Sequence, residues 1–345
     1  MTYIVGIRKP EHNFLTIISD IMVTKVFPDG KLQKENNALK SGYLFDGCIY
    51  GLCGDAIAGH KFLSSFKRLI DCKDPVQNNF DRLSNFIELT DWDSGSGFKV
   101  LFGIRNPNPE FFLLDSSNRE FKLLNEFLYT MGSGKELLDT IVSQAYIHSN
   151  ELIMDKLKQH GAPIVYYPCF VCLWLSELVL GYEEKKLSDI GVGGIFHYIY
   201  QTSEKECSPM PIVFVLSKLE NDNLIQISYR TCLINGYLII ENLNSNHISV
   251  FTSEVERQDL AERGLLDSEE IIREAHRRSR ELPIYYFCGF ATHDPSYRGF
   301  YSAHFSCNDT KVINWNGNVI SDFQDEINKN LRISKEINRT LSMTF

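Results

Sequence analysis

Thr2 is the residue of this chain whose type and position could most directly do chemistry. If Met1 is removed, the mature chain begins with Thr2 at the head of an apolar, strand-like stretch that runs to Ile7. A threonine hydroxyl is a weak nucleophile until a base takes its proton, and a terminal residue's own α-amino group can do this. The reference pKa of that amine, about 7.7–8.0, leaves a useful fraction neutral near pH 7. Thr2 could therefore supply both nucleophile and base.

Two further groups suited to this chemistry follow at the ends of predicted strands. Phe14 to Asp20 reads as a strand that ends in a carboxylate, and a polar segment then leads to Lys40. Tyr43 to Asp55 reads as two strands joined by a turn at Asp46-Gly47, closing in a corner at Gly54. A lysine held by a carboxylate could stabilise an oxyanion, and a glycine corner lets the backbone approach a substrate closely.

The set of motifs resembles the proteasome β-subunit family, which includes the bacterial HslV and Anbu peptidases, within the N-terminal-nucleophile hydrolases. Its third motif is Met131-Gly-Ser133-Gly134, between a predicted strand from Phe127 and a helix from Glu136. The resemblance lies in order, spacing and residue type. It implies that Thr2 is the nucleophile and that six other positions serve it: Asp20 and Lys40 as the charged pair beside it, Gly54 as the oxyanion N–H, Thr24 as a backbone partner of bound peptide, and Ser133 and Asp189 near the terminal amine.

Two departures from the family pattern stand out. The interval from Thr2 to Asp20 is about two residues longer than usual, which a longer turn around Pro10 to Asn13 would absorb. Val192 stands where the family usually has a serine near the terminal amine. Loss of one such polar group would slow the reaction about ten- to a thousandfold.

The resemblance also places a substrate pocket. Four apolar positions are expected around the substrate side chain that precedes the scissile bond: Val23, Ala38, Leu52 and Ala56. Because none carries a charge, we expect a preference for apolar or aromatic side chains there.

The succession of strand-like and helical runs predicts an α+β fold. Strands dominate 2–55, 98–129 and 195–230, with helical runs at 56–90, 135–159 and 168–187. This order suits a four-layer sandwich of helices around two β-sheets, the αββα arrangement of N-terminal-nucleophile hydrolases. We expect a proteasome β-like hydrolase domain over 2–235. Residues 236–345 lie outside the resemblance and form a C-terminal extension whose role the sequence does not identify.

Composition narrows the classes of partner. The chain has 345 residues and a net charge of -9, which argues against a nucleic-acid or anionic-membrane surface. No secretory signal is visible, and nine scattered cysteines fit a reducing compartment, so a cytoplasmic location is expected. No cofactor or metal is expected, because the histidines show no ligand spacing and His60 and His197 read as structural. Cys169 and Cys172 lie in an apolar run and read as buried thiols.

The sequence therefore predicts a threonine-nucleophile amide hydrolase, most simply a peptidase. The resemblance further implies a homo-oligomer, in many family members a ring, and it leaves any regulatory ATPase partner unidentified. Two alternatives stay open. One is a proteasome-like structural or binding protein with weak or no activity, which the Val192 change would favour. The other is a small-molecule amidase on the same fold.

Overall fold

The computed structural model describes most of the first 136 residues and a smaller share of those that follow. None of the described helices has the length and apolar character that crossing a membrane would need. The described residues are 2–26, 31–36, 39–71, 73–90, 97–105, 107–136, 139, 155, 158, 164, 167–169, 171–172, 175, 192–193, 195–202, 212–220, 223–234, 237–242, 245, 247–252, 269–271, 273–274, 277, 284–291, 299–305 and 310–314.

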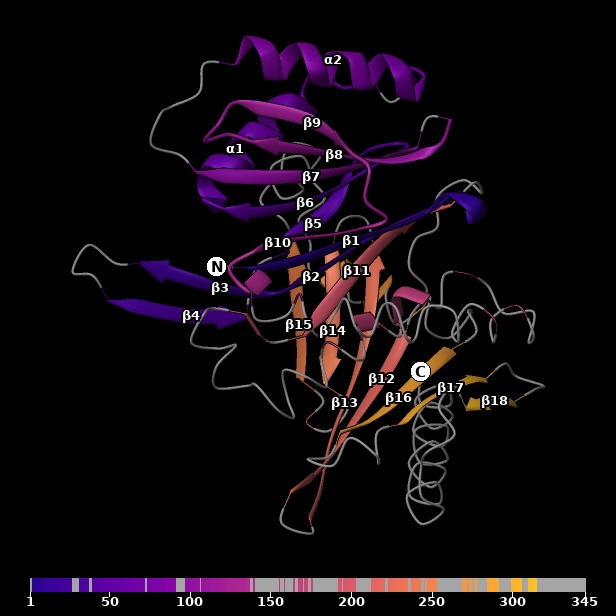
Figure 1. Ribbon diagram of the computed structural model, residues 1–345. Helices are drawn as coiled ribbons and strands as arrows, with labels where there is room; N and C mark the ends of the chain where they lie inside the picture. The colour runs from indigo at the N-terminus through magenta and orange to yellow at the C-terminus, as the bar shows by residue number, and fades with distance from the viewer. Residues whose placement is uncertain are drawn as a thin grey trace.

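The first sheet contains the strand that begins next to Thr2 (Figure 1). Its four antiparallel strands lie in the order β10 (Leu128–Gly132), β1 (Tyr3–Lys9), β2 (Phe14–Asp20) and β11 (Phe196–Gln201). All residues of β2 and β11 are buried, so both faces of the sheet are covered. The turn between β1 and β2 contains a short 3-10 helix, Pro10–His12, followed by Asn13 at φ 47°. The turn predicted around Pro10 to Asn13 is present.

The second sheet is an antiparallel meander covered on one face by two helices. Its strands follow chain order: β5 (Ser41–Phe45), β6 (Cys48–Gly54), β7 (Phe98–Arg105), β8 (Pro109–Asp115) and β9 (Glu120–Leu124). The predicted turn at Asp46-Gly47 is confirmed, with Gly47 at φ 83°. Helices α1 (Ala56–Lys67) and α2 (Val76–Leu89) cover the sheet, and the aromatic rings of Phe62, Phe66 and Phe86 pack together beneath them.

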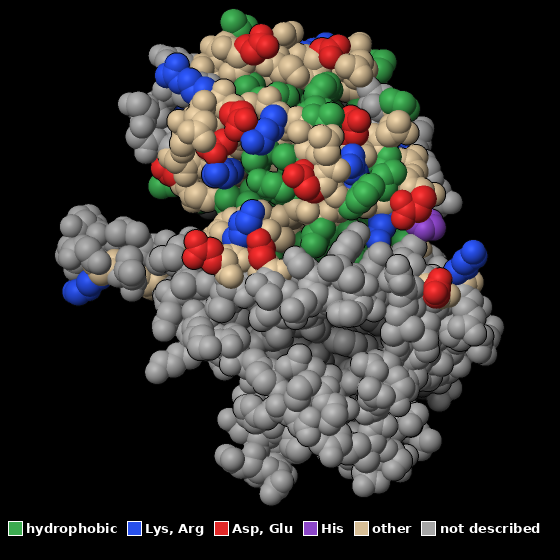
Figure 2. Space-filling view, in the orientation of Figure 1, with side chains coloured by type: hydrophobic (Ala, Val, Ile, Leu, Met, Phe, Trp, Pro, Cys, Tyr) green, Lys and Arg blue, Asp and Glu red, His purple; other side chains and the backbone are tan. Residues whose placement is uncertain are grey.

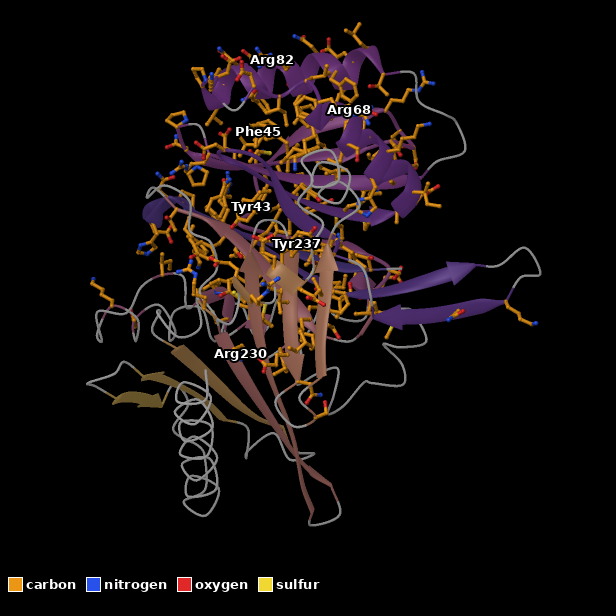
Figure 3. The ribbon with its side chains drawn as sticks, turned by 180° about the vertical axis from the view of Figure 1, so that it is seen from behind. Tyr43, Phe45, Arg68, Arg82, Arg230 and Tyr237 are labelled. Carbon is orange, nitrogen blue, oxygen red and sulfur yellow. The ribbon has the colours of Figure 1, made fainter. Side chains whose placement is uncertain are left out.

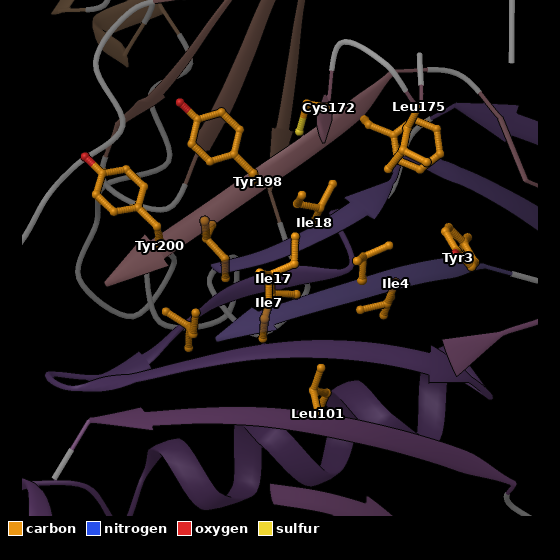
Figure 4. Packing of buried hydrophobic residues seen from close by; sticks show 14 of the residues in the cluster. Tyr3, Ile4, Ile7, Ile17, Ile18, Leu101, Cys172, Leu175, Tyr198 and Tyr200 are labelled. Carbon is orange, nitrogen blue, oxygen red and sulfur yellow. The ribbon is translucent and has the colours of Figure 1, made fainter. Parts of the chain in front are cut away.

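The two sheets stack face to face through an apolar core (Figure 4). Ile4 and Ile17 point from the four-stranded sheet towards the meander, where a Cβ on Gly51 would meet both at 3.0 Å. The absence of a side chain at Gly51 therefore lets the sheets approach closely. On the opposite face of the four-stranded sheet, Tyr198 receives a hydrogen bond from the Cys169 thiol at 3.1 Å. Cys169 and Cys172 are buried in this layer, as predicted.

Charged side chains of both signs are interspersed on the helical side of the molecule (Figure 2). Lys99 pairs with Asp115 at 2.7 Å and Lys122 with Glu120 at 3.1 Å, both at exposed lysines. The Lys122–Glu120 pair is exposed at both ends, and such pairs contribute little stability, on the order of 0–1 kcal/mol. On the face shown, the described charges are therefore mixed rather than gathered in one basic patch.

A third sheet crosses the boundary expected at residue 235. Its order is β15 (His247–Thr252), β14 (Tyr237–Asn242), β13 (Asn223–Ile234), β12 (Ile212–Glu220), β16 (Ile284–Ala291), β17 (Gly299–Phe305) and β18 (Thr310–Asn314). Arg230 of β13 forms an ion pair with Glu241, its cross-strand partner in β14 (Figure 3). The last strands assigned to the hydrolase domain thus share a sheet with the C-terminal extension.

The polar segment between Asp20 and Lys40 contains two paired strands. Strands β3 (Met22–Val26) and β4 (Leu32–Asn36) pair as a hairpin that projects from the stacked sheets (Figure 1). Strand β4 reads LQKEN, whose residues have weak strand propensity, and it forms by pairing with β3.

The structure has α/β composition with several antiparallel sheets, and three successive layers are described: the two helices, the meander and the four-stranded sheet. Most of the segment expected to form the fourth, helical layer, 135–187, lies outside the described residues. The four-layer sandwich therefore stays a prediction.

Because His197 is buried, we predict that the folded protein loses stability in acid. Its ring on β11 is 5% exposed, its Nε2 contacts no hydrogen-bond partner among the described residues, and burial lowers its pKa from 6.5 to about 3. Between pH 6.5 and 3 the unfolded chain binds a proton that the folded protein does not, so stability falls as pH falls. We expect His197→Phe to reduce the loss between pH 7 and 5 by about 2 kcal/mol in urea unfolding.

The matched control for this measurement is His12→Gln, which removes a histidine at an exposed position. If His197→Phe loses stability between pH 7 and 5 as steeply as His12→Gln does, His197 does not govern the acid sensitivity.

Candidate active site

Thr2 lies where strand β1 begins beside the end of strand β10. It is 5% exposed, and Tyr3, the first residue of β1, pairs with Gly132, the last residue of β10. This register brings the following turn onto Thr2. The Thr2 N–H donates to Ser133 Oγ at 3.1 Å, and the Gly134 N–H donates to the Thr2 carbonyl at 3.4 Å. The nitrogen that would become the α-amino group on Met1 removal therefore already contacts the predicted serine.

Gly132 permits this close contact. It has φ 103°, and a Cβ built on it would lie 2.0 Å from the Thr2 carbonyl oxygen. A residue with a side chain would therefore need a strained backbone and would also collide with backbone atoms of Thr2. The close contact with Thr2 therefore explains, without reference to any family, why glycine occupies this position of the Met-Gly-Ser-Gly motif.

The predicted charged pair is present and buried. Lys40 Nζ donates to Asp20 Oδ1 at 2.9 Å, and the side chains are 7% and 0% exposed. Asp20 also accepts hydrogen bonds from two backbone groups: Tyr3 N–H at 2.9 Å on Oδ1 and Gly193 N–H at 3.3 Å on Oδ2. One carboxylate thus links the lysine, the residue next to Thr2 and the segment after Val192.

Burial and pairing act in opposite directions on this pair. Burial lowers the pKa of Lys40, and the charge and hydrogen bond of Asp20 oppose that change. Burial also raises the pKa of Asp20, opposed by Lys40 and by the two backbone N–H groups. Desolvation disfavours each isolated charge, so the pair must stay together to remain ionised. A buried lysine of lowered pKa suits proton transfer and anion stabilisation.

Gly54 forms the corner that the sequence predicts. It ends β6 at φ 93°, where a Cβ would lie 2.3 Å from the Gly97 carbonyl oxygen. The next residue, Asp55, caps α1 by accepting the Ala58 N–H at 3.1 Å. Gly54 is exposed, so a ligand could reach this backbone. Its role as an oxyanion donor stays a prediction.

The pocket and peptide-binding positions are only partly described. Val23 and Thr24 lie in β3, where the backbone alone is described, whereas Ala38 and Asp189 lie outside the described residues. Ala56 is the exposed first residue of α1. Leu52 is 2% exposed and packs against Gly59 of α1, where a Cβ would meet its Cδ1 at 2.3 Å. Leu52 therefore belongs to the core beneath α1, and its role in a substrate pocket stays a prediction.

Val192 fills space rather than leaving a polar gap. It is fully buried in the core, and a Cβ on Gly134 would lie 2.8 Å from its Cγ2. The valine thus packs against the turn that holds Thr2. The polar partner missing from the sequence pattern is replaced by an apolar contact.

Two contacts and one electrostatic neighbour were not anticipated from the sequence. The Tyr3 and Gly193 N–H groups donate hydrogen bonds to Asp20, and the charge of Lys40 acts on the Cys53 thiol. Burial raises the pKa of Cys53 to about 11, opposed by the charges of Lys99 and Lys40. Gly193 follows Val192 in the sequence, but only the folded chain shows that its N–H lies at Asp20. The one feature of the sequence that could have indicated Cys53 is its position directly before Gly54.

We expect Gly132→Ala to displace the start of β1. The strained φ and the collision with Thr2 should lower the free energy of unfolding by about 1–3 kcal/mol in urea denaturation. Gly97→Ala is the control, because a Cβ there would meet only Ser117 Oγ, at 3.3 Å. Equal stability of the two variants would show that the space at Gly132 is not needed.

The solved structures that are similar to this chain include the following two. Eukaryotic HslV from Trypanosoma brucei matches at 12% identity and a TM-score of 0.33, over 58% of this chain and 99% of that one. Anbu (ancestral beta-subunit) from Yersinia bercovieri matches at 13% identity and a TM-score of 0.37, over 59% of this chain and 86% of that one. No protein-family model and no curated protein matches the chain. Similarity at this level assigns no activity to it.

Proposed function

We propose that this protein is a threonine-nucleophile amide hydrolase, a proteasome-like peptidase whose nucleophile is Thr2 after removal of Met1. One observation carries the proposal: Asp20 Oδ1 accepts hydrogen bonds from both Lys40 Nζ and the Tyr3 N–H, each at 2.9 Å. A buried lysine is thereby tied to the backbone directly after Thr2. A core that needed only stability would gain little from such a buried pair, since apolar residues of similar volume often do as well.

The reaction proposed here begins with attack of the Thr2 hydroxyl on an amide carbonyl carbon. The free α-amino group takes the hydroxyl proton, and the charge that develops on the carbonyl oxygen is stabilised by the Gly54 N–H. Collapse breaks the C–N bond, and the leaving nitrogen takes the proton from the Thr2 amine. Water then hydrolyses the ester and regenerates the Thr2 hydroxyl.

Neighbouring groups support the proton transfers. Lys40, held by Asp20, favours the anionic oxygen of Thr2 as it attacks. Ser133, which contacts the Thr2 nitrogen at 3.1 Å, would orient the free amine, with Asp189 in support. Because Val192 offers no hydrogen bond, this network has one polar member fewer than the family pattern.

The proposed substrate is an extended peptide. It would lie between the Thr24 and Gly54 segments as an added β-strand, with its side chains alternately entering pockets. Val23, Ala38, Leu52 and Ala56 are the pocket residues proposed. We further propose that the protein forms a homo-oligomer, with a ring as the proposed form. We also propose that it lies in the cytoplasm and needs no cofactor.

A second candidate is a structural or binding protein with weak or no activity. The buried, apolar Val192 at the turn that holds Thr2 favours it. The two candidates differ in one observable: only an active hydrolase forms a covalent bond between Thr2 and a threonine-directed electrophile.

The first test is to assay purified protein whose intact mass shows that Met1 is absent. Thr2→Ala should abolish peptide turnover because the nucleophile is lost, whereas Thr2→Ser should retain part of it. Lys40→Ala should lower turnover by about a hundredfold or more and Asp20→Asn by somewhat less. Fluorogenic peptide cleavage and electrophile labelling followed by mass spectrometry provide the measurements.

A matched control is Lys9→Ala, because Lys9 is also a buried lysine, 4% exposed, but ends β1 at the end of the strand away from Thr2. Normal turnover in Lys40→Ala would show that the assigned site is wrong. Retention of Met1 in the native protein would block the amine and favour the binding protein.

The pocket residues predict specificity. Peptides with leucine, tyrosine or phenylalanine before the scissile bond should be cleaved faster than those with arginine or aspartate, since an unpaired charge entering an apolar pocket loses its hydration. Competing fluorogenic peptides on the Met1-free protein would measure the ratio of kcat/KM values, expected to exceed about tenfold. A preference for charged residues contradicts the pocket assignment, and cleavage of small amides alone indicates the amidase.

A further inference from the structure

Two buried serines join the strands that carry the charged pair. Ser19 Oγ and Ser41 Oγ lie 3.0 Å apart in a hydrogen bond, and both residues are fully buried. Ser19 directly precedes Asp20 at the end of β2, and Ser41 directly follows Lys40 at the start of β5. The hydroxyl contact therefore lies one residue away from each member of the ion pair.

The strands concerned belong to different sheets. Strand β2 pairs with β1 and β11, whereas β5 pairs with β6 and with no other described strand, so no ladder among the described strands fixes Asp20 relative to Lys40. The Lys40 backbone is held by the meander, because its carbonyl accepts the Leu52 N–H at 2.8 Å. The distance between the two backbones must then be set by side chains that cross between the sheets.

We propose that the Ser19–Ser41 hydroxyl bridge is a positioning device that holds Lys40 against Asp20 in the geometry the hydrolysis needs. This rests on the proposed function of the site. Ser19 Oγ contacts Ser41 and Asp20 accepts a hydrogen bond from Lys40, so two adjacent residues attach the end of β2 to the Lys40–Ser41 segment at two points. The lysine chain is flexible, so the serine contact restricts the distance and orientation of the Lys40–Ser41 segment more closely than the ion pair does. Farther along β5, the Tyr43 hydroxyl also donates across the sheets, to the Tyr200 carbonyl at 3.0 Å.

A merely structural role makes a different prediction. Two hydroxyls that only satisfied each other in the core could be replaced by alanine with a change in stability alone. A positioning role predicts in addition that turnover and the proton affinity of Lys40 change. The second property can be measured without any catalytic activity.

The test compares Ser19→Ala, Ser41→Ala and the double variant with Thr16→Val. Thr16 is a suitable control because it is also fully buried on β2 and donates its hydroxyl to the Ile199 carbonyl at 2.8 Å, away from Lys40. For each protein, kcat and KM are measured on Met1-free material. The pH midpoint of Lys40 labelling by an amine-reactive reagent is read by peptide mass spectrometry.

The expected result is a kcat about tenfold lower in each single variant, with KM nearly unchanged, because misplacement affects the reacting geometry. The double variant should lose no more than either single variant, since one missing hydroxyl already breaks the bridge. The Lys40 midpoint should fall, because Asp20 raises the pKa of Lys40 and would lie farther away. Ser41→Thr, which keeps a hydroxyl, should restore part of both properties, and Thr16→Val should change neither.

Unchanged kcat and an unchanged Lys40 midpoint in all three serine variants would overturn the proposal. If the wild-type protein shows neither turnover nor electrophile labelling at Thr2, the proposed function fails, but the Lys40 midpoint still decides whether the bridge positions the pair. If the alanine variants do not fold, Ser19→Cys and Ser41→Cys replace them, because a thiol keeps the volume but weakens the hydrogen bond.

Discussion

The structure around Thr2 depends on one buried carboxylate. Asp20 is fully buried, so its charge must be compensated inside the protein. Three donors meet that need: the Lys40 ammonium and the N–H groups of Tyr3 and Gly193. They come from three segments far apart in the sequence. Any rearrangement that removes one of them leaves a buried charge less well paired, so this carboxylate resists relative movement of the segments.

The position of Thr2 depends on backbone contacts made by the turn after β10. Gly132 lies against the Thr2 carbonyl, and Ser133 and Gly134 bond the nitrogen and the carbonyl of Thr2. Val192 closes the same region with apolar packing. Thr2 is consequently only 5% exposed, although residues near the end of a chain are usually poorly ordered unless tied down.

The close stacking of two sheets explains why small residues occur where they do. Gly51 leaves room for Ile4 and Ile17, and the two serines occupy the place where the sheets must meet near the charged pair. Larger side chains would separate the sheets, and with them Asp20 and Lys40. The packing of the core therefore also fixes the distance between Asp20 and Lys40, because a displacement in a close-packed interior is passed on to its neighbours.

Local residue patterns were sufficient for several elements. The run from Phe14 to Asp20 predicted β2 to the residue, and Asp46-Gly47 predicted the turn, because alternating or continuous apolar runs and glycine turns act over a few residues. The pairing of Asp20 with Lys40, by contrast, came from the family resemblance, and the folded chain shows it. The strand pairing that orders polar β4 had no local signal, because it is imposed by β3.

The sequence by itself determined which residues could do chemistry: a threonine behind Met1, a carboxylate and lysine at strand ends, and glycine corners. Only the tertiary structure decided that Asp20 also receives the Tyr3 and Gly193 N–H groups, that Ser19 meets Ser41, and that a single sheet runs across residue 235. The physical reason is range. Propensity and turn chemistry act on neighbours in the chain, whereas strand register and sheet stacking bring together groups that no local pattern connects.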